Sequence, residues 1–150
     1  MNFPLPPDCP YYLITRATLA VTSHLKKEFI NEGVSTIKPA YLGVLLALWD
    51  EDSLKANELG KRAGLEPSTM TGLLDRMERD GLVKREPDPN DRRANRIILT
   101  KAGVDAEISS TKVLSDTLDK VFSSISKKDI EITKNVLHTI LLNCGKEDAK

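Results

Sequence analysis

The sequence predicts a mainly α-helical fold that carries a winged helix-turn-helix, and three observations lead to this prediction. Apolar residues recur at helical spacing through most of the chain. Two short helical segments, 56–63 and 67–80, are joined by the tight segment AGLEP, which is typical of a helix-turn-helix. Two strand candidates, 82–86 and 95–99, follow directly and predict a hairpin. Two short strands cannot build a sheet core, so we expect the hairpin to lean on the helices or to project from them.

The composition indicates a single soluble globular domain. The chain has 150 residues, of which 40% are hydrophobic, 29% are charged and only 5% are aromatic, a mix that favours packed helices over a β-sandwich. Its longest apolar run, Tyr41 to Trp49, is too short to span a bilayer. The N-terminal residues lack the basic and apolar regions of a signal peptide. Cys9 and Cys144 form neither a disulfide framework nor a metal-binding spacing, so we expect a cytoplasmic protein without membrane contact.

The first third of the chain predicts two helices after a proline-rich start. Residues 1–10 hold four of the eight prolines, which predicts an extended arm or a frayed end. Gly33 is expected to end the first helix, and Pro39 occupies the place of a first helical residue. Residues 39–50 are apolar almost all round, which predicts a buried central helix. The first helix, 11–31, is expected to pack through Leu13, Ala17, Ala20, Val21, His24 and Leu25.

The helix-turn-helix follows a polar break and a candidate strand at Leu54-Lys55. Leu59 and Ala63 face inward on the first helix, and Gly64 is the expected left-handed residue at its end. The second helix starts at Pro67 and turns Met70, Leu73, Leu74 and Met77 inward.

The outward face of this second helix is the first candidate functional surface. Short hydroxyl side chains and a glycine near its N-terminal end allow the backbone to approach a ligand closely, and a helix N-terminus attracts phosphate. The alternative is an ordinary surface helix with small polar residues. The face consists of Ser68, Thr69, Thr71, Gly72, Asp75, Arg76 and Arg79.

The hairpin is the second candidate surface. We expect a turn from Pro87 to Ala94, with Arg92, Arg93 and Arg96 gathered at its tip. An arginine can enter the narrow, strongly negative minor groove of DNA where a helix cannot. A solvated turn that carries charges for solubility is the alternative, and the position of the hairpin directly after the helix pair argues against it.

The last third predicts two more helices. Thr100 is expected to cap one long helix, and Ser126 with Asp129 resembles a capping box that opens the last helix. Cys144 would be the final core position of that helix. The apolar face of the long helix is expected at Val104, Ile108, Leu114, Leu118, Val121, Phe122 and Ile125. That of the last helix is expected at Ile130, Thr133, Val136, Leu137, Ile140 and Leu141.

The distribution of charge agrees with a nucleic-acid partner although the total does not. Lys plus Arg and Asp plus Glu both number 22. Residues 53–103 nevertheless carry 11 basic and 8 acidic side chains, and seven of the eight arginines fall there, the exception being Arg16. A basic middle between two slightly acidic ends is a weak indication of nucleic-acid binding.

The segment ELGKRAGLEPSTMTGLLDRMERDGLVKREPDPNDRRANRIILTKAG resembles the multiple-antibiotic-resistance regulator (MarR) family. The matching pieces are the helix pair, the stretch LLDRMERDGLVKR, the hairpin sequence DPNDRR and the following LTKAG. The resemblance implies a homodimeric, sequence-specific DNA-binding transcriptional regulator, most simply a repressor that binds a palindromic operator. It assigns residues 53–99 to the winged helix-turn-helix and residues 11–50 and 100–144 to dimerisation and support helices within one domain of 150 residues.

The resemblance also implies roles for individual residues. Asp91 and Arg93 match the Asp-x-Arg pair of the family's hairpin, so Arg93 would enter the minor groove with Arg92 and Arg96 beside it. Ser68, Thr69, Thr71 and Arg76 match positions of the recognition helix. A small aromatic or anionic ligand between the two parts of the molecule would release DNA by respacing the recognition helices, and candidate pocket residues are Tyr12, His24, Tyr41 and Trp49.

Two alternatives remain at this point. One is a winged helix used for contact with another protein, and the other is a thiol-based redox-sensing regulator that uses Cys9. Asp8 and the flanking prolines make a reactive thiolate at Cys9 the less favoured option. An enzyme is not expected, since no zinc-ligand set, phosphate-binding loop or nucleophile motif is present, and no cofactor is expected.

Overall fold

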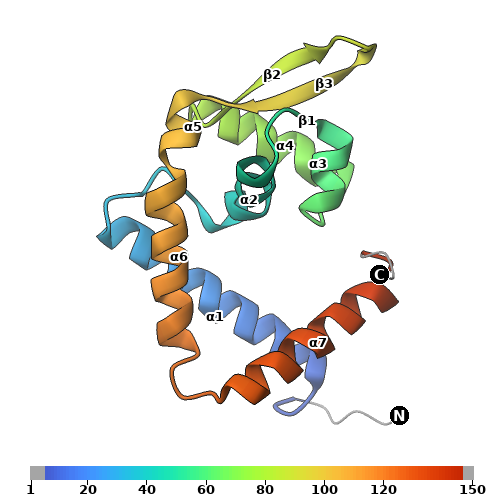
Figure 1. The fold of residues 1–150 in the computed structure, drawn as a ribbon. Helices are drawn as coiled ribbons and strands as arrows, with labels where there is room; N and C mark the ends of the chain where they lie inside the picture. Colours follow the sequence, from blue (N-terminus) through green and yellow to red (C-terminus); the bar gives the residue numbers. More distant parts are fainter. Residues whose placement is uncertain (1–5, 147–150) are drawn as a thin grey trace.

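A computed structural model describes residues 6–146, which form helices along the whole molecule and a small sheet at one end (Figure 1). The predicted mainly α-helical, winged helix-turn-helix fold is confirmed. The helices are α1 (Pro10–Asn31), α2 (Leu42–Asp50), α3 (Ala56–Arg62), α4 (Pro67–Arg79), α5 (Lys101–Asp105), α6 (Glu107–Val121) and α7 (Lys127–Asn143), with a 3-10 turn, η1, at Pro39–Tyr41. The strands are β1 (Leu54–Lys55), β2 (Val83–Asp88) and β3 (Asp91–Leu99).

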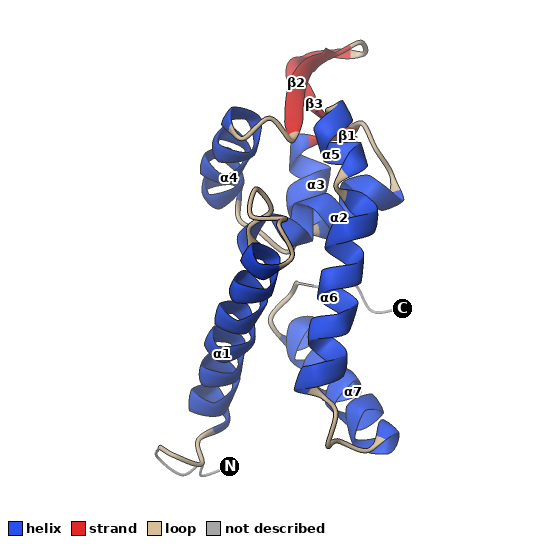
Figure 2. Cartoon of the chain, turned by 90° about the vertical axis from the view of Figure 1, so that its left-hand side faces the viewer, coloured by secondary structure: helices blue, strands red, loops and turns tan. Residues whose placement is uncertain are grey.

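The molecule has two regions that α1 and α6 connect. The sheet lies with α2, α3 and α4 at one end, while α7 and the start of α1 lie at the other (Figures 1 and 2). Of the predicted N-terminal arm, residues 1–5 lie outside the described residues, and residues 6–9 form a turn that leads into α1. No helix in the described part of the chain is long and apolar enough to cross a membrane.

The hydrophobic core belongs mainly to the end that carries the sheet. Leu45 and Leu48 of α2 are completely covered, so the predicted central helix is confirmed. The inward face of α4 is also as predicted, because its apolar residues recur every three or four positions and are all buried. They are Met70, Leu73, Leu74 and Met77.

The sheet has three antiparallel strands in the order β1-β3-β2, and its hairpin is longer than predicted. The predicted turn at 87–94 is wrong, because β2 continues to Asp88 and β3 begins at Asp91. Pro87 suggested a break, since proline cannot donate a ladder hydrogen bond. β2 is an edge strand, the position at which sheets tolerate proline, and the ladder has an irregularity between Pro87 and Asp88.

The helix after Thr100 is divided into α5 and α6 at Ala106, and its predicted apolar face is wrong in part. Val104 and Ile108 are 50% and 83% exposed. The residues of α6 that are buried are instead Ser110, Val113 and Thr117. Small side chains allow α6 to pack closely on α1, and Thr117 satisfies its hydroxyl by donating to the carbonyl of Val113 at 2.7 Å.

α7 begins as predicted but buries nothing within this chain. The Oγ of Ser126 accepts a hydrogen bond from the backbone N–H of Asp129 at 3.1 Å, which confirms the predicted cap. None of the residues of α7 is buried, and Cys144 is exposed, so its predicted core position is wrong for the single chain. On α1, Leu25 and Phe29 are buried, whereas Leu13 and His24 of the predicted face are exposed.

Candidate nucleic-acid interface

α4 presents an open polar face at the outer edge of the molecule. Pro67 occupies the first helical turn, and Ser68, Thr69, Thr71 and Arg76 are all exposed as the outward face requires. The Thr71 hydroxyl donates to the carbonyl of Pro67 at 3.1 Å, which orients this side chain along the helix. The predicted outward face of α4 is therefore accessible to a partner.

Gly72 lies in the middle of this face without an internal reason to be glycine. A Cβ built there would meet only Nη1 of Arg76, at an ordinary 3.7 Å. The helix thus has space for a side chain at this position. The missing side chain leaves the backbone open to close approach from outside the protein.

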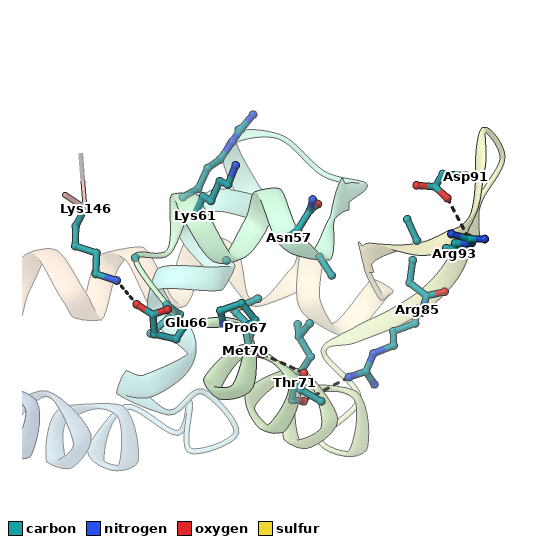
Figure 3. Close-up of a pocket in the computed structure, with 18 of the residues that line it drawn as sticks. Asn57, Lys61, Glu66, Pro67, Met70, Thr71, Arg85, Asp91, Arg93 and Lys146 are labelled. Atoms are coloured by element: carbon teal, nitrogen blue, oxygen red, sulfur yellow. Dashed lines mark hydrogen bonds and ion pairs between the residues drawn. The ribbon is translucent and has the colours of Figure 1, made fainter. Parts of the chain in front are cut away.

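Arg85 of β2 fixes the hairpin to α4. Its guanidinium donates to Asp75 at 2.6 Å and to Glu78 at 2.5 Å. It also lies 3.5 Å from the carbonyl of Thr71 (Figure 3). Burial lowers the pKa of Arg85, while the hydrogen bonds to Asp75 and Glu78 raise it and prevail, so the side chain stays charged. The fork also neutralises two acidic side chains of α4 that would otherwise repel phosphate.

The outer end of the hairpin carries two exposed arginine side chains. We call residues 87–95 the distal hairpin, since β1 pairs only with Arg96 and Ile97 of β3. Arg92 and Arg93 are exposed there, and they lie on β3 rather than in the predicted turn. Asp91 accepts a hydrogen bond from the backbone N–H of Arg93 at 3.0 Å, which orients the start of β3 (Figure 3).

Arg96 is not part of the exposed group that the sequence predicted. It lies further along β3, where its Nε donates to Asp88 at 2.7 Å and its Nη1 donates to the carbonyl of Ser53 at 2.8 Å. Across the ladder Arg96 lies opposite Glu86, and Asp88 lies two residues further along β2, so the acidic residues of β2 were the signal that could have revealed a partner for Arg96.

The residues predicted to line a ligand pocket lie on α1, η1 and α2, and their part in a pocket stays a prediction. Tyr12 lies in the first turn of α1, and His24 is exposed further along that helix. Tyr41 is buried, and its hydroxyl donates at 2.6 Å to Asp80, whose pKa is lowered by hydrogen bonds from Lys38 and Tyr41. Trp49 donates its ring N–H to the carbonyl of Gly103 at 3.0 Å. The last two side chains therefore serve packing between elements.

A hollow that the sequence did not predict lies beneath the hairpin. It has a volume of about 1170 Å³ and lies between α3, α4, the distal hairpin and the end of the described chain (Figure 3). Lys146 forms an ion pair with Glu66 across one side of it, which lowers the pKa of Glu66. Segments remote in sequence meet here, so no local pattern could reveal the hollow. Its polar lining includes Asn57, Lys61, Arg62, Thr71, Arg85 and Arg93.

No group of three or more His, Cys, Asp or Glu residues suited to a metal ion occurs within residues 6–146. Cys9 precedes the first residue of α1 and is half-buried.

A helix-turn-helix with an exposed second helix, followed by a three-stranded sheet with a projecting hairpin, defines a winged helix-turn-helix protein. The model of the MarR family matches residues 38–94. The organic hydroperoxide resistance transcriptional regulator of Bacillus subtilis is 32% identical over 103 residues, which cover 69% of this chain and 68% of that protein. The chain belongs to the MarR family and is a DNA-binding transcriptional regulator rather than an enzyme.

Solved structures agree with this assignment. A MarR-family transcriptional regulator from Silicibacter pomeroyi is 32% identical, with a TM-score of 0.65 over 88% of this chain and 87% of that one. The transcriptional repressor CouR, bound to a 23-mer DNA duplex, has a TM-score of 0.77 at 23% identity, over 87% of this chain and 91% of that one. The second likeness is one of fold.

Proposed function

We propose that this chain acts as a homodimeric repressor that binds a palindromic operator. The exposed face of α4 would enter the major groove through Ser68, Thr69 and Arg76, while Arg92 and Arg93 reach the adjacent minor groove. One observation carries this proposal. The ion pairs of Arg85 with Asp75 and Glu78 join β2 to α4, so the helix and the hairpin form one surface at one end of the molecule (Figure 1).

The dimer is supported by α7, whose apolar side chains remain exposed in the single chain. A helix with no buried residue gains little stability from packing on its own chain, and helical stability in proteins comes mainly from such packing. A second copy is the natural cover for this face. It would also set the spacing of two recognition helices, which a palindrome with half-sites one turn apart requires to be about 34–36 Å.

Release by a small aromatic or anionic ligand is supported by the hollow. Its lining joins Pro67 and Thr71 of α4 to Arg93 of the hairpin, so an occupant would contact both DNA-reading elements. A ligand that prefers another arrangement of these elements would shift the population away from the DNA-binding state. Thermal unfolding with benzoate and other aromatic carboxylates tests this, because a binder raises the unfolding temperature by mass action.

The test of DNA contact is Arg93→Ala, measured by anisotropy of a labelled duplex. For each protomer of the dimer we expect a loss of about 1–3 kcal/mol of binding free energy and a salt dependence shallower by about 0.9 in log–log slope, so the dimer should show about twice each change. The unfolding temperature should stay unchanged, since an exposed side chain contributes little packing. Arg16→Ala, which removes an exposed arginine of α1, is the matched control. Wild-type affinity of the Arg93 variant would refute the proposed contact.

A further inference from the structure

A carboxylate is buried in the distal hairpin, where most side chains are exposed. Asp88 is only 3% exposed, and acidic side chains are rarely buried to this degree unless they are paired. Its Oδ2 accepts from Nε of Arg96 at 2.7 Å, its Oδ1 accepts from the backbone N–H of Asn90 at 2.8 Å, and Lys55 Nζ lies 3.9 Å from Oδ2. Asp88 therefore holds the end of β2 against the sheet rather than facing solvent.

Arg96 carries this connection to the loop before β1. Its Nη1 donates to the carbonyl of Ser53, a residue with a left-handed φ of 61°. That loop is fixed in turn, because Asp52 accepts from the backbone N–H groups of Ser53 at 2.7 Å and Leu99 at 3.0 Å. Asp88 and Arg96 thus connect the outer end of the hairpin to an anchored part of the domain.

The distal hairpin needs such a connection. β1 ends opposite Arg96, so residues 87–95 form a two-stranded ribbon without a third strand. Such a ribbon is at best marginally stable by itself. The hollow lies between this ribbon and α3 with α4, and Arg93 and Asp91 line it. The position of Arg93 relative to α4 therefore depends on the contacts that hold the ribbon where it joins the three-stranded part of the sheet, at Arg96.

We propose that Asp88 and Arg96 are positioning residues that hold Arg93 in register with α4, and that Arg96 does not itself contact DNA. This inference rests on the proposed function of Arg93. It also changes the role of Arg96, which the sequence predicted to contact DNA together with Arg92 and Arg93.

The two roles for Arg96 predict opposite effects for Asp88→Asn. If Arg96 contacted DNA directly, removal of its carboxylate partner would release the guanidinium and remove one negative charge near phosphate, and affinity would rise. If the pair positions Arg93, the same substitution loosens the ribbon, and affinity falls. We expect a fall of about tenfold, the scale of one lost groove contact.

The experiment measures affinity and salt dependence on a duplex selected from a random pool by the wild-type chain. The variants are Asp88→Asn, Arg96→Gln, Arg93→Ala and the double variant Asp88→Asn/Arg93→Ala. Glu86→Gln is the matched control, because it removes an exposed acid of the same strand that pairs with Lys84 at 2.5 Å. Its affinity should be unchanged or higher. Each variant is first unfolded thermally, and binding is measured well below its transition.

We expect Asp88→Asn and Arg96→Gln to weaken binding alike and to lower the salt slope by the amount that Arg93→Ala does. In the Arg93→Ala background, Asp88→Asn should have no further effect, because the contact it positions is already gone. Higher or unchanged affinity for Asp88→Asn, or an additive loss in the double variant, would overturn the proposal. Wild-type binding by Arg93→Ala would instead refute the proposed function.

Arg96→Lys decides the question if Asp88→Asn does not fold. Lysine keeps the positive charge for phosphate but has a single ammonium in place of the fork that reaches both Asp88 and Ser53. A loss of affinity in the folded Arg96→Lys chain that disappears in the Arg93→Ala background supports positioning. Unchanged affinity, or a loss that adds to that of Arg93→Ala, refutes it.

Discussion

At the scale of single residues, two helical glycines show that the same residue type serves different ends. Gly72 faces open space on α4, whereas Gly103 of α5 is buried against the sheet. The sequence alone shows only that both interrupt helical segments. Their surroundings show that Gly103 is required by packing, whereas Gly72 has room for a side chain, which agrees with the proposed contact between α4 and DNA.

Gly72→Ala should therefore separate stability from binding. Alanine favours the helix interior by about 0.5–1 kcal/mol over glycine, and the site has room for its methyl group. We expect a higher unfolding temperature together with weaker DNA binding, because the methyl group would stand between α4 and the duplex. Stability comes from thermal unfolding and affinity from anisotropy. An unchanged affinity would mean that the α4 backbone does not approach DNA at this point.

Asp88 gives the chain a defined response to acid. The N–H of Asn90 lowers the pKa of Asp88 below its ordinary 3.8, burial acts in the opposite direction, and Arg96 and Lys55 add to the lowering. The unfolded chain then binds more protons than the folded chain below about pH 4, so the stabilisation is present above that pH and is lost as pH falls through the folded pKa.

We therefore expect the advantage in stability of wild type over Asp88→Asn at pH 6 to become smaller at pH 3, below the ordinary pKa of the carboxyl group. The measurement is urea unfolding of both chains at each pH. An equal difference in the free energy of unfolding at the two pH values would contradict the ionic role of Asp88.

At the scale of elements, the junction between the sheet and α5 is built around close backbone approach. Thr100 caps α5 by accepting from the N–H of Gly103 at 3.1 Å, and its own N–H donates to the carbonyl of Leu82 at 3.0 Å. A Cβ on Gly103 would overlap that Leu82 carbonyl and would lie 3.1 Å from a methyl group of Leu99. The junction thus sets the direction in which the chain leaves the hairpin for α6.

Gly103→Ala should destabilise the chain, in contrast to Gly72→Ala. The new methyl group meets backbone rather than a flexible side chain, so the cost is at least that of core overpacking, about 1–3 kcal/mol. Chemical unfolding of both variants beside wild type gives the comparison. Wild-type stability for Gly103→Ala would show that α5 can move away from the sheet at no cost.

The elements differ in how well their sequences predict them. α4 was predicted with its buried face because its four inward residues follow one helical period without interruption. The extent of the hairpin was not predicted correctly, because proline usually ends a strand unless the strand lies at the edge of a sheet. Whether β2 is an edge strand depends on the whole sheet, which the local sequence does not show. The buried face of α6 was missed for a similar reason, since Ser110 and Thr117 are small and polar and are buried by a helix eighty or more residues away in sequence.

At the scale of the whole molecule, the chain has one end with a complete core and one end without. The core residues cluster around α2, α4 and the sheet. α7 instead leaves its apolar residues exposed to between 37% and 52%. The exposed set is Ile132, Val136, Leu137, Ile140, Leu141 and Leu142. This difference supports the proposed division between a DNA-binding end and a dimerisation end.

Replacement of Val136 and Ile140 by glutamate should abolish the dimer and weaken operator binding together. Charges cannot be buried unpaired in an apolar interface, and one recognition helix cannot occupy two half-sites. Light scattering after size exclusion gives the mass, and anisotropy gives the affinity. Glu131→Gln, an exposed position on the side of α7 away from Val136 and Ile140, should change neither. A monomeric double variant with full affinity would refute the coupling of assembly to DNA binding.

The sequence by itself determined the order of the helices, the inward face of α4, the helix caps and the family, because each depends on neighbours within a few residues along the chain. Only the tertiary structure decided the extent of the hairpin, the pairing of Arg85 with α4 and of Arg96 with Asp88, and the hollow beneath them. A sequence does not distinguish one arginine from another. The strands and helices that lie beside a guanidinium decide whether it pairs with a carboxylate or stays exposed. That arrangement is fixed by burial of side chains far apart along the chain, which no local pattern records.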